Sequence, residues 1–585
     1  MVRSVRLAAL FSALAFMLVS SSCIKNVTPQ NKPKENQEQK EGQQEEEQSG
    51  DDPAAAYEDW EDSNTNVSGF VVDDAGNPIE GCAVSDGLNT VVTDAKGHYG
   101  LKATLTKAKF IFVSVPAKYE VPAINCLPQH YKSVSSLKKN GSGNYRGVNF
   151  ALTRRTVAAN DFTIFVYADP QPRAASASYD KIGYHSLEIA DDVYSDIADV
   201  AAATSGEKFS LVLGDLVHEN MDLYANYKSG VKKTGVTTHQ VIGNHDNDTK
   251  ASDDDAGAKP FESHFGPRNY SFNVGEWHFV MVDNLIMKLS GSKLSDYSQG
   301  LTDDFWTWLQ GDLEALCPKA ERAQHHIMIC SHSPMFMIRG SDYSAKSSTK
   351  HGTDYASLLS QFGKVYSWGG HHHNTFNYVY PESNMRKNIE QHTVARCTGR
   401  LWTNDWVNGD GTPRGYVIVK VKGTSVSWQY KCIDRQTGTC QSGSPAYLYR
   451  PWNYASGYAV LKDNGNRVDT SLQMTVYDRG LYGDNNIYAN VWMYDGRWEL
   501  PVLKYDNGKQ VEFKEVTDES RMYDYGYKEN HDHYTAYSST YSGTEMGTTS
   551  ARSHIFYVAA PTSSGGGTVE VTDRFGNVYT ASVKW

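Results

Sequence analysis

The chain has 585 residues, which is too long for one compact hydrophobic core and favours three or four domains. Its net charge is -12, so a nucleic acid is not expected as the main partner, because phosphate backbones bind basic surfaces. The 37 tyrosines, together with many threonines and valines, favour a chain rich in β structure.

The N-terminus has the pattern of an export signal. Two arginines precede an apolar run, Leu7 to Val19, which is too short for a comfortable membrane span and ends in small residues. These small residues meet Cys23 directly and resemble the lipobox of bacterial lipoproteins, although Ser20 stands where leucine is commoner. We expect a signal peptide over residues 1–22 and a membrane anchor through a lipidated Cys23. The alternative is an ordinary signal peptide with a nearby free cysteine.

Within residues 23–62, the stretch 31–53 has almost no apolar side chains and cannot fold alone, so residues 23–62 are expected to form a disordered polar and acidic tether. A lipid anchor followed by a tether predicts an extracytoplasmic protein, held at the outer membrane or cell surface. The periplasm is the alternative location.

Residues 63–154 alternate short β-rich runs with turn signals, for example at Asp74 to Pro78 and Asp94 to Gly97. Strands at this spacing predict a small β-sandwich. The segment resembles the regulatory-type β-sandwich found beside carboxypeptidases and in many bacterial surface proteins. Nothing in it indicates catalysis.

Residues 155–432 alternate strand and helix patterns, which predicts an α/β layered domain. Helices are expected within 184–205 and 301–316, the second with Thr302 as N-cap. Strands are expected within 161–170, 209–215, 239–246, 277–284, 325–334 and 364–374.

Residues 433–585 are again rich in strand patterns, which predicts a second β-sandwich. Asp495-Gly496 is a hairpin signal and Gly576-Asn577 a turn signal in this segment. The expected fold class is therefore multidomain, with a central α/β domain between two small all-β sandwich domains.

Polar side chains gather at the carboxyl ends of the predicted central strands. In an α/β sheet that edge is where ligands bind. The residues are Asp169, Gln171, Asp215, Asn244, His245, Asp246, His332 and the histidine run 371–373. Carboxylate, amide and imidazole donors without a nearby thiolate suit Mn, Fe, Zn or Ni, and their number is too high for one ion. Two ions that share a carboxylate would use them all, with Asp215 as the candidate bridge.

These motifs identify a family resemblance. Asp169-x-Gln171, Gly214-Asp215, Gly243 to Asp246, Ser331-His332 and Gly370-His371-x-His373 occur in the order seen in calcineurin-like metallophosphoesterases. The resemblance covers about residues 160–430. It implies a four-layer α/β sandwich, and the flanking segments resemble the N- and C-terminal accessory domains of Bacteroidetes-type members.

The resemblance also implies roles for individual residues. Asp169, Asp215 and His373 would hold one metal, with Gln171 beside them. The second metal would be held by Asp215, Asn244, His332 and His371. His245 would act as general acid or transition-state donor, with Asp246 orienting its imidazole, while a hydroxide that bridges the metals attacks phosphorus.

One residue departs from the family pattern. The first motif is usually Asp-x-His, whereas this chain has Gln171 in the second position. An amide oxygen is a weaker donor than imidazole, so we expect a weaker first site that favours Mn or Fe over Zn. Two divalent ions are the expected cofactors, with Mn favoured.

The histidine run contains two kinds of histidine. On an extended chain His371 and His373 share a side, whereas His372 faces the other way. We therefore expect His371 and His373 to be ligands and His372 to be a spacer.

Three further residues near the motifs have alternative interpretations. His218 is either a neighbour of the site or an ordinary loop histidine. Asn284 ends a strand near the site edge and could shape the pocket. Arg414, on a loop with Trp402 and Trp406, could wall the pocket or simply belong to a hairpin.

The sequence thus predicts an exported, lipid-anchored phosphoesterase. Its substrate would be a phosphorylated small molecule, a lipid head group or a glycan, with monoester, diester and pyrophosphate hydrolysis all open. The rival hypothesis is a non-catalytic surface binding protein with a vestigial metal domain. A decayed enzyme would have little reason to keep His245, which is not a metal ligand.

Overall fold

A computed structural model describes residues 60, 62–174, 186–338, 341–400, 407–433, 473–480, 483–506, 508–517 and 554–585. The predicted signal peptide, Cys23 and almost all of the tether lie outside these residues, as do Trp402 and Trp406. Within the described part of the chain, no helix has the length and apolar character needed to cross a membrane.

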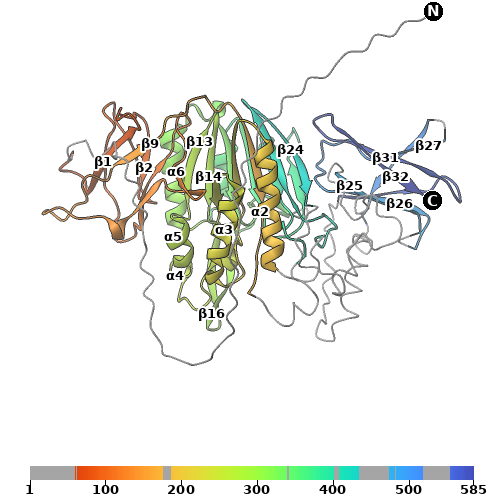
Figure 1. Ribbon diagram of the computed structural model, residues 1–585, viewed down its shortest axis with the longest axis horizontal. Coiled ribbons are helices and arrows are strands. Elements are labelled where there is room, and N and C mark those ends of the chain that lie inside the picture. The colour runs from red at the N-terminus through yellow and green to blue at the C-terminus, as the bar shows by residue number, and fades with distance from the viewer. Residues whose placement is uncertain are drawn as a thin grey trace, which may run out of the picture. The chain divides into compact units, whose positions relative to one another are not determined.

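The central region is built on two sheets (Figure 1). The five-stranded sheet has the order β12 (Thr238–Gln240), β11 (Glu207–Val212), β10 (Asp161–Tyr167), β23 (Gly415–Lys422) and β24 (Ser425–Cys432). The six-stranded sheet has the order β13 (Tyr270–Val274), β14 (Trp277–Val282), β17 (His326–Ser331), β20 (Lys364–Gly369), β22 (Ile389–Thr393) and β21 (Phe376–Val379). Strands β10, β11 and β12 run parallel, as do β14, β17, β20 and β22.

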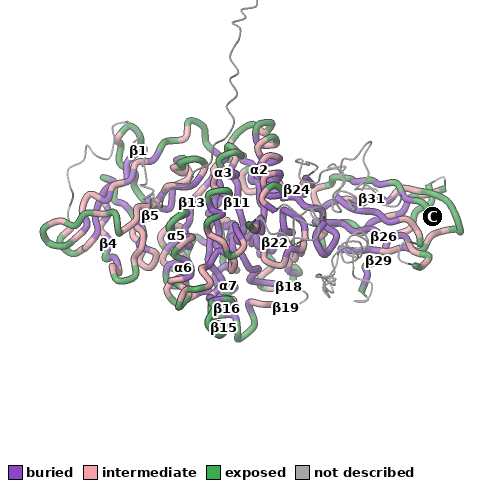
Figure 2. Tube along the Cα trace, turned by 60° about the horizontal axis from the view of Figure 1, so that its bottom comes forward, coloured by how far each residue is buried: buried purple, intermediate pink, exposed green. Residues whose placement is uncertain are grey.

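Strand β10 shows how the layers form. Successive side chains of a strand point to opposite faces, and six of the seven residues of β10 are buried. The strands of the central region are buried along most of their length (Figure 2). Ile164 and Val166 belong to the large core that includes the six-stranded sheet. Phe165 and Tyr167 pack with the buried faces of α2 (Ser186–Ala203) and α3 (Tyr224–Thr234).

Helices also cover the outer face of the six-stranded sheet. Asp312 of α6 (Asp303–Leu316) accepts a hydrogen bond from Ser271 of β13 at 2.7 Å and bonds His278 of β14 at 3.0 Å. The ring of Tyr355, on α7 (Gly352–Leu359), lies 5.6 Å from that of Phe336, which follows β17. The central region is thus a helix, sheet, sheet, helix arrangement, as predicted.

The predicted helices and strands of the central region are present with shorter bounds. Thr302 caps α6 as expected, since its side chain accepts from the backbone N–H of Phe305. Ile189, Val193 and Ile197 form the buried stripe of α2. Each strand stops before its polar motif, which leaves the chemistry-bearing residues in the loops that follow.

The region before β10 contains two small sheets of three and four strands, besides the two-stranded pair of β6 (Ala123–Ile124) and β7 (Leu127–Pro128). One has the order β4 (His98–Leu101), β1 (Val67–Asp73) and β9 (Phe150–Leu152). The other has the order β3 (Thr90–Val92), β2 (Ala83–Ser85), β5 (Phe110–Ser114) and β8 (Tyr131–Ser133). Their assignment to a separate β-sandwich domain stays a prediction.

The described part of the C-terminal region contains two four-stranded sheets. One has the order β25 (Met474–Tyr477), β26 (Asn486–Val491), β30 (Ile555–Ala559) and β29 (Lys514–Glu515). The other has the order β28 (Lys509–Glu512), β27 (Val502–Tyr505), β31 (Gly566–Thr572) and β32 (Val578–Lys584). The turn at Gly576-Asn577 joins β31 to β32 as predicted. The hairpin at Asp495-Gly496 was wrong, because β26 and β27 belong to different sheets.

Candidate metal centre

Loops from both central sheets meet at the carboxyl ends of the parallel strands. The loop after β10 carries Asp169 and Gln171, and the loop after β11 carries Asp215. Asn244 and His245 follow β12. From the six-stranded sheet, His332 follows β17 and the histidine run follows β20. The contacts that hold these loops determine how the candidate ligands are placed.

The loop after β10 has an unusual backbone. Asp169 and Gln171 have positive φ angles of 51° and 44°, a conformation that costs a non-glycine residue roughly 1–3 kcal/mol. Arg396 Nη2 donates to the carbonyls of Pro170 and Gln171 at 3.3 and 3.2 Å. Thr398 Oγ1 donates to the carbonyl of Pro170 at 3.2 Å. These bonds hold both side chains toward the centre despite the strain.

Asp215 lies in the middle of the centre and is buried. Its Oδ1 accepts from the backbone N–H of His245 at 2.9 Å, and its Oδ2 accepts from Gln171 Nε2 at 2.8 Å. His332 Nε2 lies 3.3 Å from the same Oδ2. Burial raises the pKa of Asp215, but the imidazoles of His332 and His245 outweigh it and hold the pKa below its usual value. Asp215 is thus an ionised carboxylate at the middle of the centre, which is the position that a residue bridging two metal ions requires.

One half of the centre is formed by Asp169, Asp215 and His373. A ligand atom from each of the three lies within 4.8 Å of the others. His373 Nε2 lies 3.5 Å from Asp169 Oδ1. Burial lowers the pKa of His373, so its imidazole is neutral and offers a lone pair.

The other half of the centre surrounds His332. Its Nε2 lies 3.1 Å from Asn244 Oδ1, 3.1 Å from His371 Nδ1 and 3.3 Å from Asp215 Oδ2. Its Nδ1 donates to the carbonyl of Leu213 at 2.7 Å, which fixes the ring and leaves Nε2 toward the centre. Burial lowers the pKa of His332, but the charges of Asp215 and Asp169 outweigh it and raise the pKa to about 10.

The histidine run faces the centre for a different reason from the one expected. Strand β20 ends at Gly369, so residues 371–373 are not extended. Instead His371 and His373 have positive φ angles of 68° and 59°, and the backbone N–H of His371 donates to Asp169 Oδ2 at 2.9 Å. The prediction that both side chains reach the same place holds, but its argument from strand alternation is wrong.

The loop after the histidine run is tied to the C-terminal region. The backbone N–H of Thr375 donates to Asp410 Oδ2 at 2.8 Å. His554 Nε2 contacts the same oxygen at 3.0 Å, and Asn490 Nδ2 donates to the Asp410 carbonyl at 2.7 Å. Asp410 and Asn490 are fully buried. The C-terminal region therefore contributes to the placement of the loop that carries His373.

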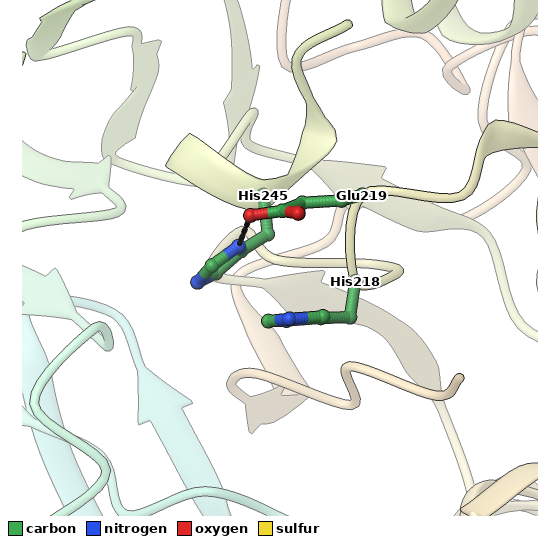
Figure 3. A group of neighbouring side chains, drawn as sticks. All are labelled: His218, Glu219 and His245. Atoms are coloured by element: carbon green, nitrogen blue, oxygen red, sulfur yellow. Dashed lines mark ion pairs between the residues drawn. The ribbon is translucent and has the colours of Figure 1, made fainter. Parts of the chain in front are cut away.

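His245 lies beside the centre with its own partners (Figure 3). Its Nδ1 lies 3.3 Å from Glu219 Oε1, and its ring packs on that of His218 with centroids 4.1 Å apart. Burial lowers the pKa of His245, but the charges of Asp215 and Glu219 outweigh it and raise the pKa above its ordinary value. Ligand atoms of His218, Glu219 and His245 also lie within 4.8 Å of one another, so this group is a second arrangement able to hold a cation.

Asp246 does not orient the imidazole of His245, and that part of the prediction is wrong. Its carboxylate accepts from the backbone N–H groups of Gly243, Leu216 and Val217 at 2.9, 3.1 and 3.3 Å. Burial and the charge of Asp215 raise the pKa of Asp246 to about 7. Asp246 thus holds the loops after β11 and β12 together, while Glu219 contacts the imidazole.

Two family models match the chain outside most of this centre. A model described as the N terminal of calcineurin-like phosphoesterase matches residues 65–155. A model described as the C terminal of calcineurin-like phosphoesterase matches residues 391–579. The chain belongs to the calcineurin-like phosphoesterases. This is a family of metal-dependent phosphoester hydrolases.

Comparison with solved structures gives only low similarity to this calcineurin-like phosphoesterase. A 5′-nucleotidase precursor from Thermus thermophilus is 13% identical over 47% of this chain and 54% of its own, with a TM-score of 0.27. An NAD nucleotidase from Haemophilus influenzae is 11% identical over 47% and 50%, with a TM-score of 0.24. A 5′-nucleotidase from Candida albicans is 14% identical over 48% and 53%, with a TM-score of 0.22. The chain spans about half the length of these proteins. Similarity this low gives no information about the substrate.

No curated protein sequence matches this calcineurin-like phosphoesterase.

The side chains of the phosphoesterase centre fit a divalent cation. The donors are carboxylate oxygens, amide oxygens and imidazole nitrogens, which suit Mn, Fe or Zn. Gln171 Oε1 is buried and has no hydrogen-bond partner among the described residues, which leaves a donor oxygen available.

Glycines allow the loops of the phosphoesterase to approach this closely. A Cβ at Gly243 would lie 2.1 Å from Asp215 Oδ1, and one at Gly214 would lie 2.5 Å from His332 Nδ1. Gly214 also has a φ of +84°. Larger residues at these positions would displace the candidate ligands.

Backbone strain is concentrated at the centre. Ten non-glycine residues of the described ranges have positive φ, and six of them lie here. These six are Asp169, Gln171, Asp215, Glu219, His371 and His373. Such conformations persist where the surroundings over-determine them, and they cluster at functional sites.

Several interpretations from sequence change in the structure. Glu219 was missed, although it follows His218 directly in the motif that starts at Gly214. Tyr297, whose hydroxyl contacts His371 Nε2 at 2.7 Å, was also missed, and no local pattern marks it. Arg414 does not wall a pocket, because its guanidinium is buried and lies 3.2 Å from Asp192.

Proposed function

We propose that the protein is an exported phosphoesterase with a centre for two divalent metal ions. The observation that carries this proposal is the convergence of six oxygen- and nitrogen-bearing side chains, from loops of both sheets, around the central carboxylate of Asp215. A binding protein without catalysis has no need for His245, which lies beside this centre but outside the ligand set.

The proposed ligands divide into two sets that share Asp215. Asp169, His373 and Gln171 complete the first set. Asn244, His332 and His371 complete the second. Bound ions would supply Lewis-acid activation of water and neutralise charge on the phosphate oxygens.

Gln171 makes the first set bind its metal ion more weakly than the second set. An imidazole would offer a stronger donor than its amide, and Gln171 Nε2 already donates to Asp215 in the structure. We propose that the first set prefers Mn or Fe over Zn. Metal analysis after dialysis tests this preference, and tightly retained Zn in both sets would contradict it.

His245 is the proposed proton donor. Glu219 lies at Nδ1, and the second ring nitrogen faces away from Glu219 (Figure 3). The raised pKa of His245 keeps more of the imidazole protonated near neutral pH. Nε2–H can then donate to the leaving oxygen of the ester as the bond to phosphorus breaks.

Asp215 serves His245 as well as the metals. Its Oδ1 accepts from the backbone N–H of His245 at 2.9 Å, so the position of the imidazole depends on the central carboxylate. The ring of His218 packs on the His245 ring, with centroids 4.1 Å apart. These contacts restrict the imidazole before substrate binds, which is the preorganisation that proton donors require.

The proposed location is outside the cytoplasm. The basic start, the short apolar run and Cys23 support a signal peptide with lipid attachment. The substrate would then be an extracytoplasmic phosphate ester, either a small molecule, a lipid head group or a glycan. Labelling with radioactive palmitate and partition of the protein into a detergent phase test the anchor. Both should be lost in Cys23→Ser.

Hydrolysis tests the proposed activity directly. The purified protein, loaded with Mn or with Zn, is offered a generic phosphomonoester and a generic phosphodiester. We expect one class to be hydrolysed, and His245→Ala to lower kcat on the order of 10²-fold or more without loss of metal. His325→Ala is the matched control, because His325 lies at the opposite end of β17 from His332. No hydrolysis of either ester by fully metallated protein would contradict the proposal.

A further inference from the structure

A hairpin at the edge of the central region reaches the candidate metal centre. It consists of β15 (Leu285–Ser290) and β16 (Lys293–Gln299), and Leu285 pairs with Gln299 at its base. The hairpin begins two residues after β14 ends, on the side of the sheet where the site loops gather. The backbone N–H of Gly300 donates to the Asn284 carbonyl at 2.9 Å and closes the base.

The base of the hairpin holds the segment that follows His332. Asn284 Oδ1 accepts from the backbone N–H of Ser333 at 3.1 Å, and its Nδ2 donates to the Ser333 carbonyl. Gln299 Nε2 donates to Ser333 Oγ at 3.0 Å and to the Pro334 carbonyl. Asn284 is fully buried. Both ends of the hairpin thus fix the backbone immediately after a candidate ligand.

The second strand of the hairpin contacts a different candidate ligand. The Tyr297 hydroxyl lies 2.7 Å from His371 Nε2, and the two rings are edge-on with centroids 5.4 Å apart. The other nitrogen of His371, Nδ1, lies 3.1 Å from His332 Nε2. When His371 Nε2–H donates to the Tyr297 oxygen, the lone pair of the neutral imidazole is on Nδ1, which faces His332 and the centre.

We infer that the β15–β16 hairpin is a clamp on the half of the centre formed by His332 and His371, with Tyr297 as the positioning residue for His371. The inference rests on the proposed function, because it assigns a purpose to contacts around proposed ligands. A histidine that binds a metal through one nitrogen is held by a hydrogen bond at the other, and the loss of such a partner typically weakens metal binding about 10–100-fold.

The clamp acts on one half of the centre. Its contacts described above reach His371 and the two residues after His332. The loop after β22 instead holds the backbone that follows Asp169 through Arg396, and the link through Thr375 and Asp410 holds the chain that follows His373. Removal of the Tyr297 hydroxyl should therefore weaken one ion and leave the other in place.

Calorimetric titration of the full chain with Mn²⁺ tests the clamp. We expect two binding events for the wild type, and in Tyr297→Phe one of them weakened about 10-fold or more with the other unchanged. Ser298→Ala is the matched control, since it removes a hydroxyl from the next residue of the same strand, where the side chain faces the other side of the hairpin. We expect the control to bind both ions as the wild type does.

Three outcomes would overturn the clamp. Unchanged binding of both ions by Tyr297→Phe removes its basis. A change in KM alone, with both ions retained, would make Tyr297 a substrate contact. Equal weakening of both ions, with a lower melting temperature, would indicate a general structural role. A wild type that binds no Mn²⁺ would instead overturn the proposed function, which separates the two failures.

Discussion

The three consecutive histidines differ in what they contact. His371 and His373 contact His332 and Asp169, whereas the half-buried His372 lies edge-on to the ring of His371 with centroids 5.2 Å apart. We predict that His371→Ala and His373→Ala each lose one ion and lower kcat/KM at least 10²-fold, because loss of an outer partner alone costs about 10–100-fold. Metal content and ester hydrolysis measure both effects.

His372→Ala is the internal control for that prediction. We expect two ions, nearly full activity and a change in unfolding free energy of about 0.5 kcal/mol or less, as for a residue outside the ligand set. Loss of metal in His372→Ala equal to that in its neighbours would contradict the division of the run into two ligands and a spacer.

Glu219 provides a second prediction for a single residue. Replacement by glutamine removes the charge that raises the pKa of His245. We expect Glu219→Gln to keep both ions, to lower kcat about 10-fold, and to move the alkaline limb of the kcat profile to lower pH. The alkaline limb moves to lower pH because a less stabilised imidazolium loses its proton at lower pH. A pH–rate series on metal-loaded protein measures the shift, and an unshifted profile would contradict this role.

At the level of single residues, the sequence was most informative where a polar residue directly follows a predicted strand. Asp169, Asp215 and His332 follow predicted strands directly, so their meeting at one sheet edge could be anticipated. Glu219 and Tyr297 could not be assigned in this way. Glu219 reaches His245 through a left-handed backbone, with a φ of 53°, and Tyr297 arrives from a hairpin whose position depends on tertiary packing.

The histidine loop is an element in which backbone geometry decides function. Gly370 separates β20 from the ligands, and a Cβ there would lie 2.6 Å from Asp169 Oδ2 and 2.8 Å from Ala168 Cβ. We predict that Gly370→Ala costs about 1–3 kcal/mol in stability and weakens the first ion, because the added methyl displaces Asp169. Thermal unfolding and Mn²⁺ titration measure the two effects.

Gly496→Ala is the control for this substitution. A Cβ at Gly496 meets nothing within 4 Å, so we expect a change of about 0.5 kcal/mol or less and unchanged metal binding. Equal effects of the two substitutions would contradict the steric argument for Gly370.

At the level of elements, sequence periodicity located the helices and strands but not the turns between them. The stripe of Ile189, Val193 and Ile197 follows from a helical period alone. The left-handed turns at Asp169 and His371 depend on contacts with distant segments, including Arg396 and the Asp169 carboxylate itself. For this reason the extended conformation assumed for the histidine run was wrong.

At the scale of the whole molecule, two uncharged histidines are buried where the N-terminal region meets the central sheets. His130 precedes β8, and its ring contacts that of Tyr270 on β13 at 4.8 Å. Both nitrogens of His130 lack a hydrogen-bond partner among the described residues. Burial lowers the pKa of His130 from 6.5 to about 3 and also lowers that of His239, on β12, well below 6.5.

These histidines predict a loss of stability in mild acid. Below pH 6.5 these two histidines bind protons in the unfolded chain but not in the folded chain. Their contribution to stability is therefore complete above pH 6.5 and is lost as the pH falls. Between pH 6.5 and about pH 5, His130 contributes a loss of roughly 2 kcal/mol. We predict that His130→Phe removes this part of the pH dependence in thermal unfolding. An unchanged slope would contradict the assignment, and His325→Phe should leave the slope as it is.

The link between regions could not have been predicted from sequence. Thr375, Asp410 and His554 are separated by long stretches of chain, and each belongs to a different local pattern.

The most direct test of the account is the number and position of metal ions in a crystal grown with Mn²⁺. Anomalous scattering should show two peaks. One should lie among Asp169, Asp215 and His373, and the other among Asp215, Asn244, His332 and His371. A single peak, or a peak among His218, Glu219 and His245 in place of either, would contradict the proposed centre.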